Sequence, residues 1–183
     1  MTTLADAFAS FRTSAWRLEA RDDYDVPEYA DELSAFRAGL PRPPRSDGWK
    51  DIVQGAVWRG AHIGRVRLVG RPISDYTRFE FALYEENVAW GEDVRLADRT
   101  WLDGSWADAP DVWLFDDEIA FRQDYTDEGR YLGASRIDAG PVREMRRLTL
   151  AAAVPLADFR LTDAPLPRPE SAPAAALPYI TSV

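Results

Sequence analysis

The sequence contains no cysteine, one histidine and one lysine, and each shortage excludes a kind of chemistry. Without cysteine there can be no disulfide, thiolate nucleophile, cysteine-ligated zinc or iron–sulfur cluster. With one histidine, no metal can be held by two imidazoles, and any histidine-based triad would have to use His62. His62 lies between an expected helix and an expected strand. We therefore expect a surface or capping role for it, with catalysis as the alternative.

Several sequence signatures are also missing. The nucleotide-binding patterns GxGxxG and GxxxxGK[ST] and the hydrolase pattern GxSxG do not occur. No run of 18 apolar residues could span a membrane, and the first residues do not resemble a signal peptide. Because a chain without disulfides suits a reducing compartment, we expect a cytoplasmic location. We expect no cofactor and no metal.

Positive charge is scarce relative to negative charge, since the chain has 22 basic and 31 acidic residues and a net charge of −9. An acidic surface repels phosphate backbones, so direct binding of nucleic acid is not expected. Lysine occurs once against 21 arginines. Either a GC-rich genome or a need for bidentate contacts with carboxylates or phosphates would explain this preference.

The chain has ordinary globular composition, with 46% hydrophobic and 29% charged residues among 183. We predict one globular domain over residues 1–162 and a proline- and alanine-rich tail over residues 163–183. Because prolines are dense in the tail, we expect it to form no regular core element and to be mobile.

Hydrophobic spacing predicts alternating helices and strands in the first half of the chain. Apolar residues at helical intervals predict helices over residues 4–14, 27–39 and 49–60. Strict alternation predicts a strand over residues 14–26 with Trp16 and Leu18 inward and with Arg17 and Glu19 on a solvated face. Residues 65–69 predict a further strand, and residues 41–48 form a proline-rich connector.

Residues 74–90 fit both periodicities. As a helix they place Tyr76, Phe79, Leu83, Asn87 and Trp90 on one stripe, and as a strand they place Phe79, Phe81 and Leu83 on one face. The helix is favoured because Ser74 can cap its start and Gly91 can end it. With the strands over residues 65–69 and 92–99, this helix would complete a parallel strand–helix–strand crossover.

The later part of the chain predicts further strands and a closing helix. Residues 111–125 read as a hairpin turning at Asp116 and Asp117, residues 129–138 as another strand, and residues 141–161 as a helix broken or kinked at Pro155. The predicted fold class is therefore α/β. It is a single domain with a mixed sheet, at least one parallel crossover, a late antiparallel hairpin and flanking helices.

Polar residues near the expected carboxyl ends of the strands are candidates for a binding site, because ligands of open α/β sheets usually bind at that edge. The set contains Arg67 or Arg71, Asp75, Arg78, Glu80 and Glu92. The alternative is a surface salt-bridge network, for example Asp75 with Arg78. Asp116, Asp117 and Glu118 could hold a hard cation such as Mg²⁺, although a turn between strands explains them equally well.

Three strings, FRTSAWRLEARDDYDVP, SDYTRFEFALYEENVAWGEDVRL and VWLFDDEIAFRQDYTDEGRYLGA, resemble an uncharacterised family of actinobacterial domains. The resemblance covers about residues 8 to 160. It implies an accessory regulatory role, since such domains often accompany helix-turn-helix regulators. The motif residues that it carries over are Arg12, Ser14, Trp16, Arg17, Glu19, Asp75, Tyr76, Arg78, Glu80, Asn87, Gly91, Glu92, Asp116 and Asp117, none with an assigned catalytic role.

The crossover and hairpin also resemble one half of a phospholipase D-like domain. Those enzymes need histidine and lysine in an H-x-K pattern, whereas here Lys50 precedes His62 by twelve residues. This resemblance would therefore imply an inactive relative that could still bind a ligand or dimerise.

Two functional hypotheses follow. The first is a cytoplasmic, non-catalytic regulatory or interaction domain whose partner is a DNA-binding regulator protein. The second is a small-molecule sensor or an enzyme that uses the polar constellation. The candidate ligand-binding residues are Arg17, Arg67, Asp75, Tyr76, Arg78, Glu80, Asn87, Glu92, Asp116 and Asp117. Nothing in the sequence indicates an oligomeric state.

Overall fold

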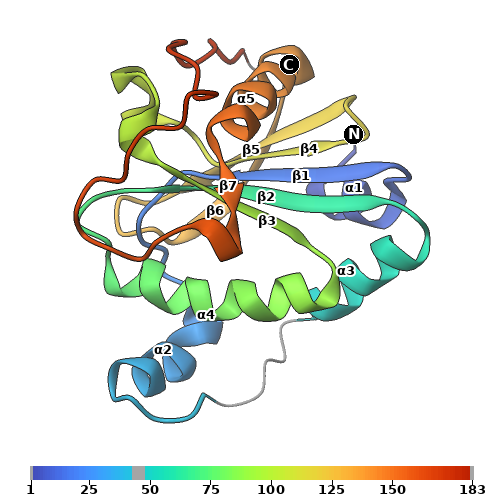
Figure 1. The fold of residues 1–183 in the computed structure, drawn as a ribbon. Coiled ribbons are helices and arrows are strands. Elements are labelled where there is room, and N and C mark those ends of the chain that lie inside the picture. The colour runs from blue at the N-terminus through green and yellow to red at the C-terminus, as the bar shows by residue number, and fades with distance from the viewer. Residues whose placement is uncertain (1, 43–47, 182–183) are drawn as a thin grey trace.

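A computed structural model describes residues 2–42 and 48–181. Its centre is a seven-stranded mixed sheet in the order β6-β5-β4-β1-β2-β3-β7 (Figure 1). The strands are β1 (Ser14–Glu19), β2 (His62–Val69), β3 (Asp93–Asp98), β4 (Val112–Phe115), β5 (Ile119–Tyr125), β6 (Tyr131–Ile137) and β7 (Val154–Pro155). The helices are α1 (Leu4–Ser10), α2 (Ala30–Arg37), α3 (Trp49–Trp58), α4 (Asp75–Trp90) and α5 (Ala139–Ala152). The predicted α/β class is confirmed.

The three central strands are parallel, and the strands on both sides of them are antiparallel. β1 pairs with β2 and β2 with β3 in parallel, so β2, α4 and β3 form the predicted crossover. β4, β5 and β6 follow as antiparallel neighbours, which confirms the late hairpin. In Figure 1, α5 lies on one side of the sheet and α4 on the other.

Local sequence signals determine the ends of α4 as expected. The Ser74 side chain accepts a hydrogen bond from the Thr77 backbone N–H, which caps the first turn. Gly91 ends the helix in a left-handed conformation with φ of 108°, where a side chain would be strained and would meet Val57. The helix prediction for residues 74–90 is therefore confirmed over the strand alternative.

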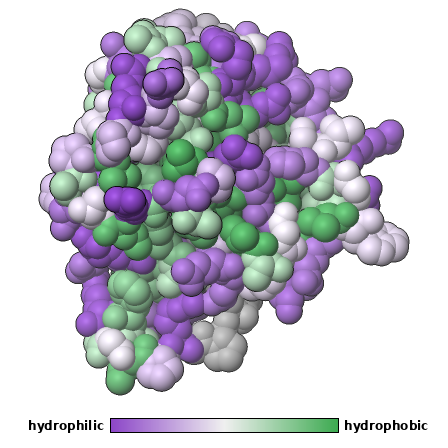
Figure 2. Space-filling model, viewed as in Figure 1, coloured by the Kyte–Doolittle hydropathy of each residue, from purple (hydrophilic) through white to green (hydrophobic). Residues whose placement is uncertain are grey.

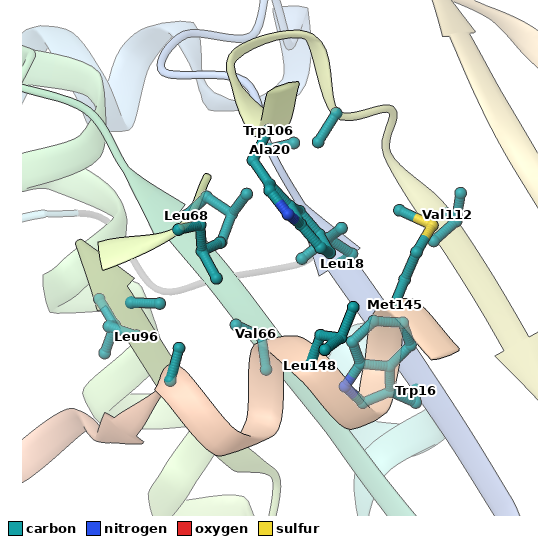
Figure 3. Close-up of a cluster of buried hydrophobic side chains, with 14 of the residues drawn as sticks. Trp16, Leu18, Ala20, Val66, Leu68, Leu96, Trp106, Val112, Met145 and Leu148 are labelled. Carbon is teal, nitrogen blue, oxygen red and sulfur yellow. The ribbon is translucent and has the colours of Figure 1, made fainter. Parts of the chain in front are cut away.

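The face of the sheet toward α5 carries an apolar core. Trp16 and Leu18 of β1 and Val66 and Leu68 of β2 are buried there with Met145 of α5 (Figure 3). Strand alternation places these residues on one face because side chains two apart point the same way. The inward direction predicted for Trp16 and Leu18 is confirmed.

The opposite face of the same strands is not solvated, and that prediction is wrong. Glu19, Arg65 and Arg67 are almost fully buried, and Arg17 is largely covered, beneath α4 and its neighbours. Buried charges are tolerated only when they are paired, and the pairing partners come from distant parts of the chain. The predicted strand also ends at Glu19 rather than at residue 26.

The end of the chain differs from the expectation as well. α5 begins at Ala139 and stops at Ala152, and Val154–Pro155 then joins the sheet as β7 beside β3. The tail forms no helix or strand within its described part, but it lies against the domain instead of extending freely. The indole N–H groups of Trp101 and Trp106 donate hydrogen bonds to the Leu166 and Ala175 carbonyls.

The extent of the described residues and the character of their helices and surface also bear on the fold. Residues 43–47, most of the expected proline-rich connector, lie outside the described residues. Within residues 2–42 and 48–181, none of the helices has the length and apolar character needed to cross a bilayer. The surface in Figure 2 intersperses hydrophilic and hydrophobic residues.

Candidate functional site

A cavity of about 410 Å³ lies on the α4 side of the sheet. Neighbouring strands form its floor, and their register decides which side chains meet there. Arg17 of β1 pairs with Arg65 of β2 on one side and with Trp113 of β4 on the other. Paired residues of neighbouring strands point to the same face. The described floor residues that line the cavity are Arg17, Glu19, Arg65, Trp113, Gln123 and Tyr125.

Helices, the segment after β1 and the start of β6 build the walls. The inner side of α4 contributes residues spaced by three or four positions, which is the helical repeat. Aromatic rings from other segments complete the enclosure and give it a mainly aromatic surface. The described wall residues are Tyr76, Glu80, Leu83, Tyr84 and Asn87 from α4, with Leu4, Phe8, Tyr24, Val26, Tyr29, Trp49 and Tyr131.

Glu19 is the centre of a buried ionic network in the floor. Its carboxylate lies 3.0 Å from the Arg17 and Arg65 guanidiniums and accepts a 2.7 Å hydrogen bond from the Tyr84 hydroxyl. Burial by itself raises the pKa of Glu19, but Arg17, Arg65 and Arg67 together lower it well below the ordinary range. Glu19 is therefore an ionised and fully satisfied carboxylate.

Arg65 joins Glu19 to Glu92. Its Nε lies 2.6 Å and its Nη2 3.2 Å from the two oxygens of Glu92, which is a bidentate arrangement. The Trp49 indole N–H donates to the same carboxylate at 2.8 Å. Although burial opposes a charged guanidinium, Glu19 and Glu92 raise the pKa of Arg65 further above its usual value. Glu92 thus orients Arg65 from behind the cavity.

Arg67 and Glu80 form the second buried pair, with Arg67 Nη1 lying 3.0 Å from Glu80 Oε2. Arg67 also donates to the Thr77 hydroxyl and to the Asp22 carbonyl. Burial raises the pKa of Glu80 to about 7, and the opposing effect of Arg67 is not enough to cancel it. Glu80 therefore differs from Glu19, because its carboxyl group exchanges a proton near neutral pH.

Asp111 fixes the remaining edge of the floor. Its carboxylate accepts a hydrogen bond of 2.6 Å from the Tyr24 hydroxyl and one of 2.8 Å from the Ala20 backbone N–H. Arg17 Nη2 approaches it at 3.5 Å. These contacts hold Tyr24 and Arg17 in place at the cavity.

Six of the ten predicted site residues gather in or directly behind this cavity. Arg17, Tyr76, Glu80 and Asn87 line it, and Arg67 and Glu92 support the lining from beneath. The position of Arg67, Glu80 and Glu92 differs from the prediction, since they lie across the sheet face under α4 rather than grouped at the carboxyl ends of the strands. The reason is that α4 runs back along the sheet, so that Glu92 follows it at the amino end of β3.

Asp75 and Arg78 point away from this group. Asp75 has an exposed side chain that comes within 3.9 Å of Arg37, and Arg78 lies 2.6 Å from Asp163. The ion pair between Asp75 and Arg78, which was the alternative to a binding site, is therefore replaced by pairs with other segments. Both residues occupy the outer side of α4, so neither contributes to the cavity.

A separate cavity of about 590 Å³ does lie near the carboxyl ends of β1 and β3, where the sequence predicted a site. It is lined by acidic residues such as Asp22, Asp23 and Asp108, together with Arg99, and by none of the predicted site residues. Within the described ranges, no group of three or more acidic or histidine side chains has the geometry of a metal site.

Asp116 and Asp117 form the turn between β4 and β5, with φ of 50° and 62°. The Asp116 carboxylate accepts hydrogen bonds from the backbone N–H groups of Arg12, Thr13 and Ser14. Asp117 is bound by Arg146 at 2.5 and 2.9 Å. The turn interpretation therefore explains both residues, and neither approaches the cavity.

Replacing Asp116 by alanine is expected to lower the free energy of unfolding by about 2–3 kcal/mol. The variant loses several hydrogen bonds to backbone N–H groups, and alanine adopts the left-handed backbone conformation less readily than aspartate does. Although partial burial would raise the pKa of Asp116, the three backbone N–H groups lower it to about 2. Its stabilisation is therefore present above about pH 4 and lost as the pH falls toward 2. Urea denaturation at both pH values measures this, with Glu118→Ala as the exposed control; equal losses in the two variants would contradict the structural role.

Sequence reasoning did not select Arg65, Tyr24, Asp111 or Tyr125, and it counted Glu19 only as a motif residue. The alternation in β1 and β2 contained the necessary signal, because Arg17 and Glu19 occupy the same face as Arg65 and Arg67. Two charged faces on adjacent parallel strands cannot both be solvated when a crossover helix covers them.

The fold and the site define an α/β domain with an open mixed sheet and an aromatic cavity built over a buried ionic network. The chain belongs to the family described as domain of unknown function DUF6879, which it matches over residues 2–161. No curated protein matches the chain.

Proposed function

We propose that this domain binds a small organic molecule in the aromatic cavity and acts as a ligand-binding regulatory module. The observation that carries the proposal is the combination of about 410 Å³ of space with aromatic walls and a charged floor that is already ordered. Small-molecule sites are concave, mainly apolar and typically of 300–1,000 Å³, with a few fixed polar groups that give orientation.

The state of the floor residues supports binding over catalysis. Glu19, Arg65 and Glu92 are each held by two or more partners, so their role is to present a fixed pattern of charge. The described lining contains acidic, amide, guanidinium and aromatic groups, and the one carboxyl group without such restraint is Glu80. This arrangement suits recognition of a polar ligand.

The regulatory part of the proposal comes from the resemblance to domains that accompany helix-turn-helix regulators. In this scheme the ligand would change how the domain contacts a DNA-binding partner, and both proteins would be cytoplasmic. Co-purification with and without a bound ligand tests the partnership separately from ligand binding.

Tyr131→Ala is expected to weaken ligand binding about tenfold, because Tyr131 lines the cavity and stacks edge-on against Tyr125 at 5.7 Å. Leu132→Ala is the matched control, since Leu132 is the next residue of β6, is 67% exposed and does not line the cavity. A panel of amines, carboxylic acids and neutral aromatic compounds is screened by thermal shift, and hits are titrated calorimetrically. Equal affinity in both variants, or no hit in the panel, would contradict the proposal.

A further inference from the structure

We propose that the ligand of the aromatic cavity carries a protonated amine or a guanidinium group and that Glu80 is its counter-ion. This inference rests on the proposed function and specifies the chemical class of the ligand. It depends on four features of the described residues: the hydrogen bonding of Glu80, the charge balance, the aromatic walls and the exchangeable proton.

The first feature is that Glu80 has fewer partners than the other buried carboxylates. Glu19, Glu92 and Asp111 each accept at least two hydrogen bonds. Among the described residues, Arg67 Nη1 lies 3.0 Å from Glu80 Oε2, and this oxygen accepts no well-aligned hydrogen bond. The side chain is 8% exposed and lines the cavity, so a ligand that enters can donate to it.

The second feature is the charge balance. In the described network, four carboxylates (Glu19, Glu80, Glu92 and Asp111) face three guanidiniums (Arg17, Arg65 and Arg67), which leaves 3 − 4 = −1 when all are ionised. The nearby Asp22 is bound by Arg99 and does not add to this cluster. Buried charge of one sign is costly, so the cavity favours a ligand that brings one positive charge.

The third feature is the nature of the walls. Aromatic faces attract cations, and the chain already uses them in this way around the cavity. The Arg65 guanidinium lies 5.4 Å from the Trp49 ring and 5.2 Å from Tyr84, and that of Arg67 lies 5.2 Å from Tyr24. A ligand cation beside Glu80 would be close to Tyr76 of the preceding helical turn, in the same type of environment.

The fourth feature is the exchangeable proton of Glu80. The charged groups around it are Arg67 and Arg65 from β2, Arg17 and Glu19 from β1, and the hydroxyls of Tyr24, Tyr76 and Tyr84 complete the surroundings. In the free protein, burial keeps part of the Glu80 population protonated at neutral pH, and a bound cation favours the ionised carboxylate. Cation binding should therefore release a proton and should strengthen as the pH rises from 6 to 8.

Two matched pairs of probes test the inference: tyramine against 4-ethylphenol, and benzamidine against benzamide. Within each pair the ring is retained and the positive charge is removed. We expect the cations to bind at least tenfold more tightly than their neutral partners, since hydrogen bonds between charged groups are stronger than those between neutral groups. Calorimetry at pH 7 in buffers of different ionisation enthalpy should detect proton release when the cations bind.

The variant Glu80→Gln removes the charge while keeping the shape, and it should abolish the preference for cations and the proton release. Glu85→Gln is the matched control, because Glu85 lies on the exposed side of the same helix. Where Glu80→Gln is too unstable to titrate, proton release by the wild-type protein decides the question. The inference is overturned if the neutral probes or benzoate bind as tightly as the cations or more tightly. It is also overturned if the cations bind without proton release. In either case the proposed binding function still stands. Failure of every probe and of the wider panel overturns both.

Discussion

Replacing Arg65 by methionine is expected to lower the free energy of unfolding by about 3–5 kcal/mol, which is the usual cost of removing one partner from a buried ion pair. Arg65 contacts Glu19 at 3.0 Å and Glu92 at 2.6 Å, and all three side chains are buried. Methionine preserves much of the volume, so the loss comes mainly from two carboxylates left without their cation. Guanidinium denaturation followed by circular dichroism measures the change.

The dependence of this effect on pH separates charge from packing. Arg65 is one of the cations that lower the pKa of the buried Glu19 carboxyl group, so without it this group takes up a proton more readily. The destabilisation should therefore shrink as the pH falls from 7 to 5. Arg95→Met is the control, since Arg95 pairs with Asp93 at a side chain that is 36% exposed, and it should cost less than about 1 kcal/mol. A loss at Arg65 that is equally small, or is constant with pH, would contradict the account.

The sequence predicted local structure well because local signals determine it. The Ser74 cap and the Gly91 stop decide the ends of α4, and alternation in β1 decides which residues share a face. Whether a charged face meets water or protein is a different kind of question. Its answer depends on contacts such as Glu19 with Arg65, which are 46 residues apart in the chain.

The candidate site was predicted in part for the same reason. The helical stripe through Tyr76, Leu83 and Asn87 also contains Glu80, and these four residues line the cavity. Asp75 and Arg78 occupy the other side of α4. Helical periodicity alone could therefore have separated Glu80 from the two residues that were grouped with it. The remaining members required knowledge of strand order and register, which no local pattern supplies.

The tail shows the limit of arguments from composition. Proline excludes helices and sheets from the tail because it lacks the N–H that they need, but it does not prevent docking of an extended chain. Leu166, Leu177 and Ile180 are partly buried against the core, and the Leu177 backbone N–H donates to the Ser105 hydroxyl at 2.8 Å. Hydrophobic residues placed between prolines therefore anchor a segment that has no secondary structure.

Trp106→Ala is expected to lower the free energy of unfolding by about 3–5 kcal/mol and to release the tail. Trp106 is fully buried between the sheet and the tail, and its indole N–H donates to the Ala175 carbonyl at 3.0 Å. Alanine would leave a large cavity at this position and would leave that carbonyl without its donor. Chemical denaturation gives the loss of stability, and limited proteolysis of the folded protein reports on the tail.

Trp106→Phe separates the two contributions of this side chain, because phenylalanine fills most of the space but cannot donate a hydrogen bond. We expect it to recover more than half of the stability lost in Trp106→Ala, while cleavage within residues 163–181 remains faster than in the wild-type protein. If both variants protect the tail as well as tryptophan does, the indole is not an anchor, and the docking must depend on the apolar contacts of Leu166 and Leu177. If Trp106→Ala loses less than about 1 kcal/mol, the packing assigned to this residue is wrong.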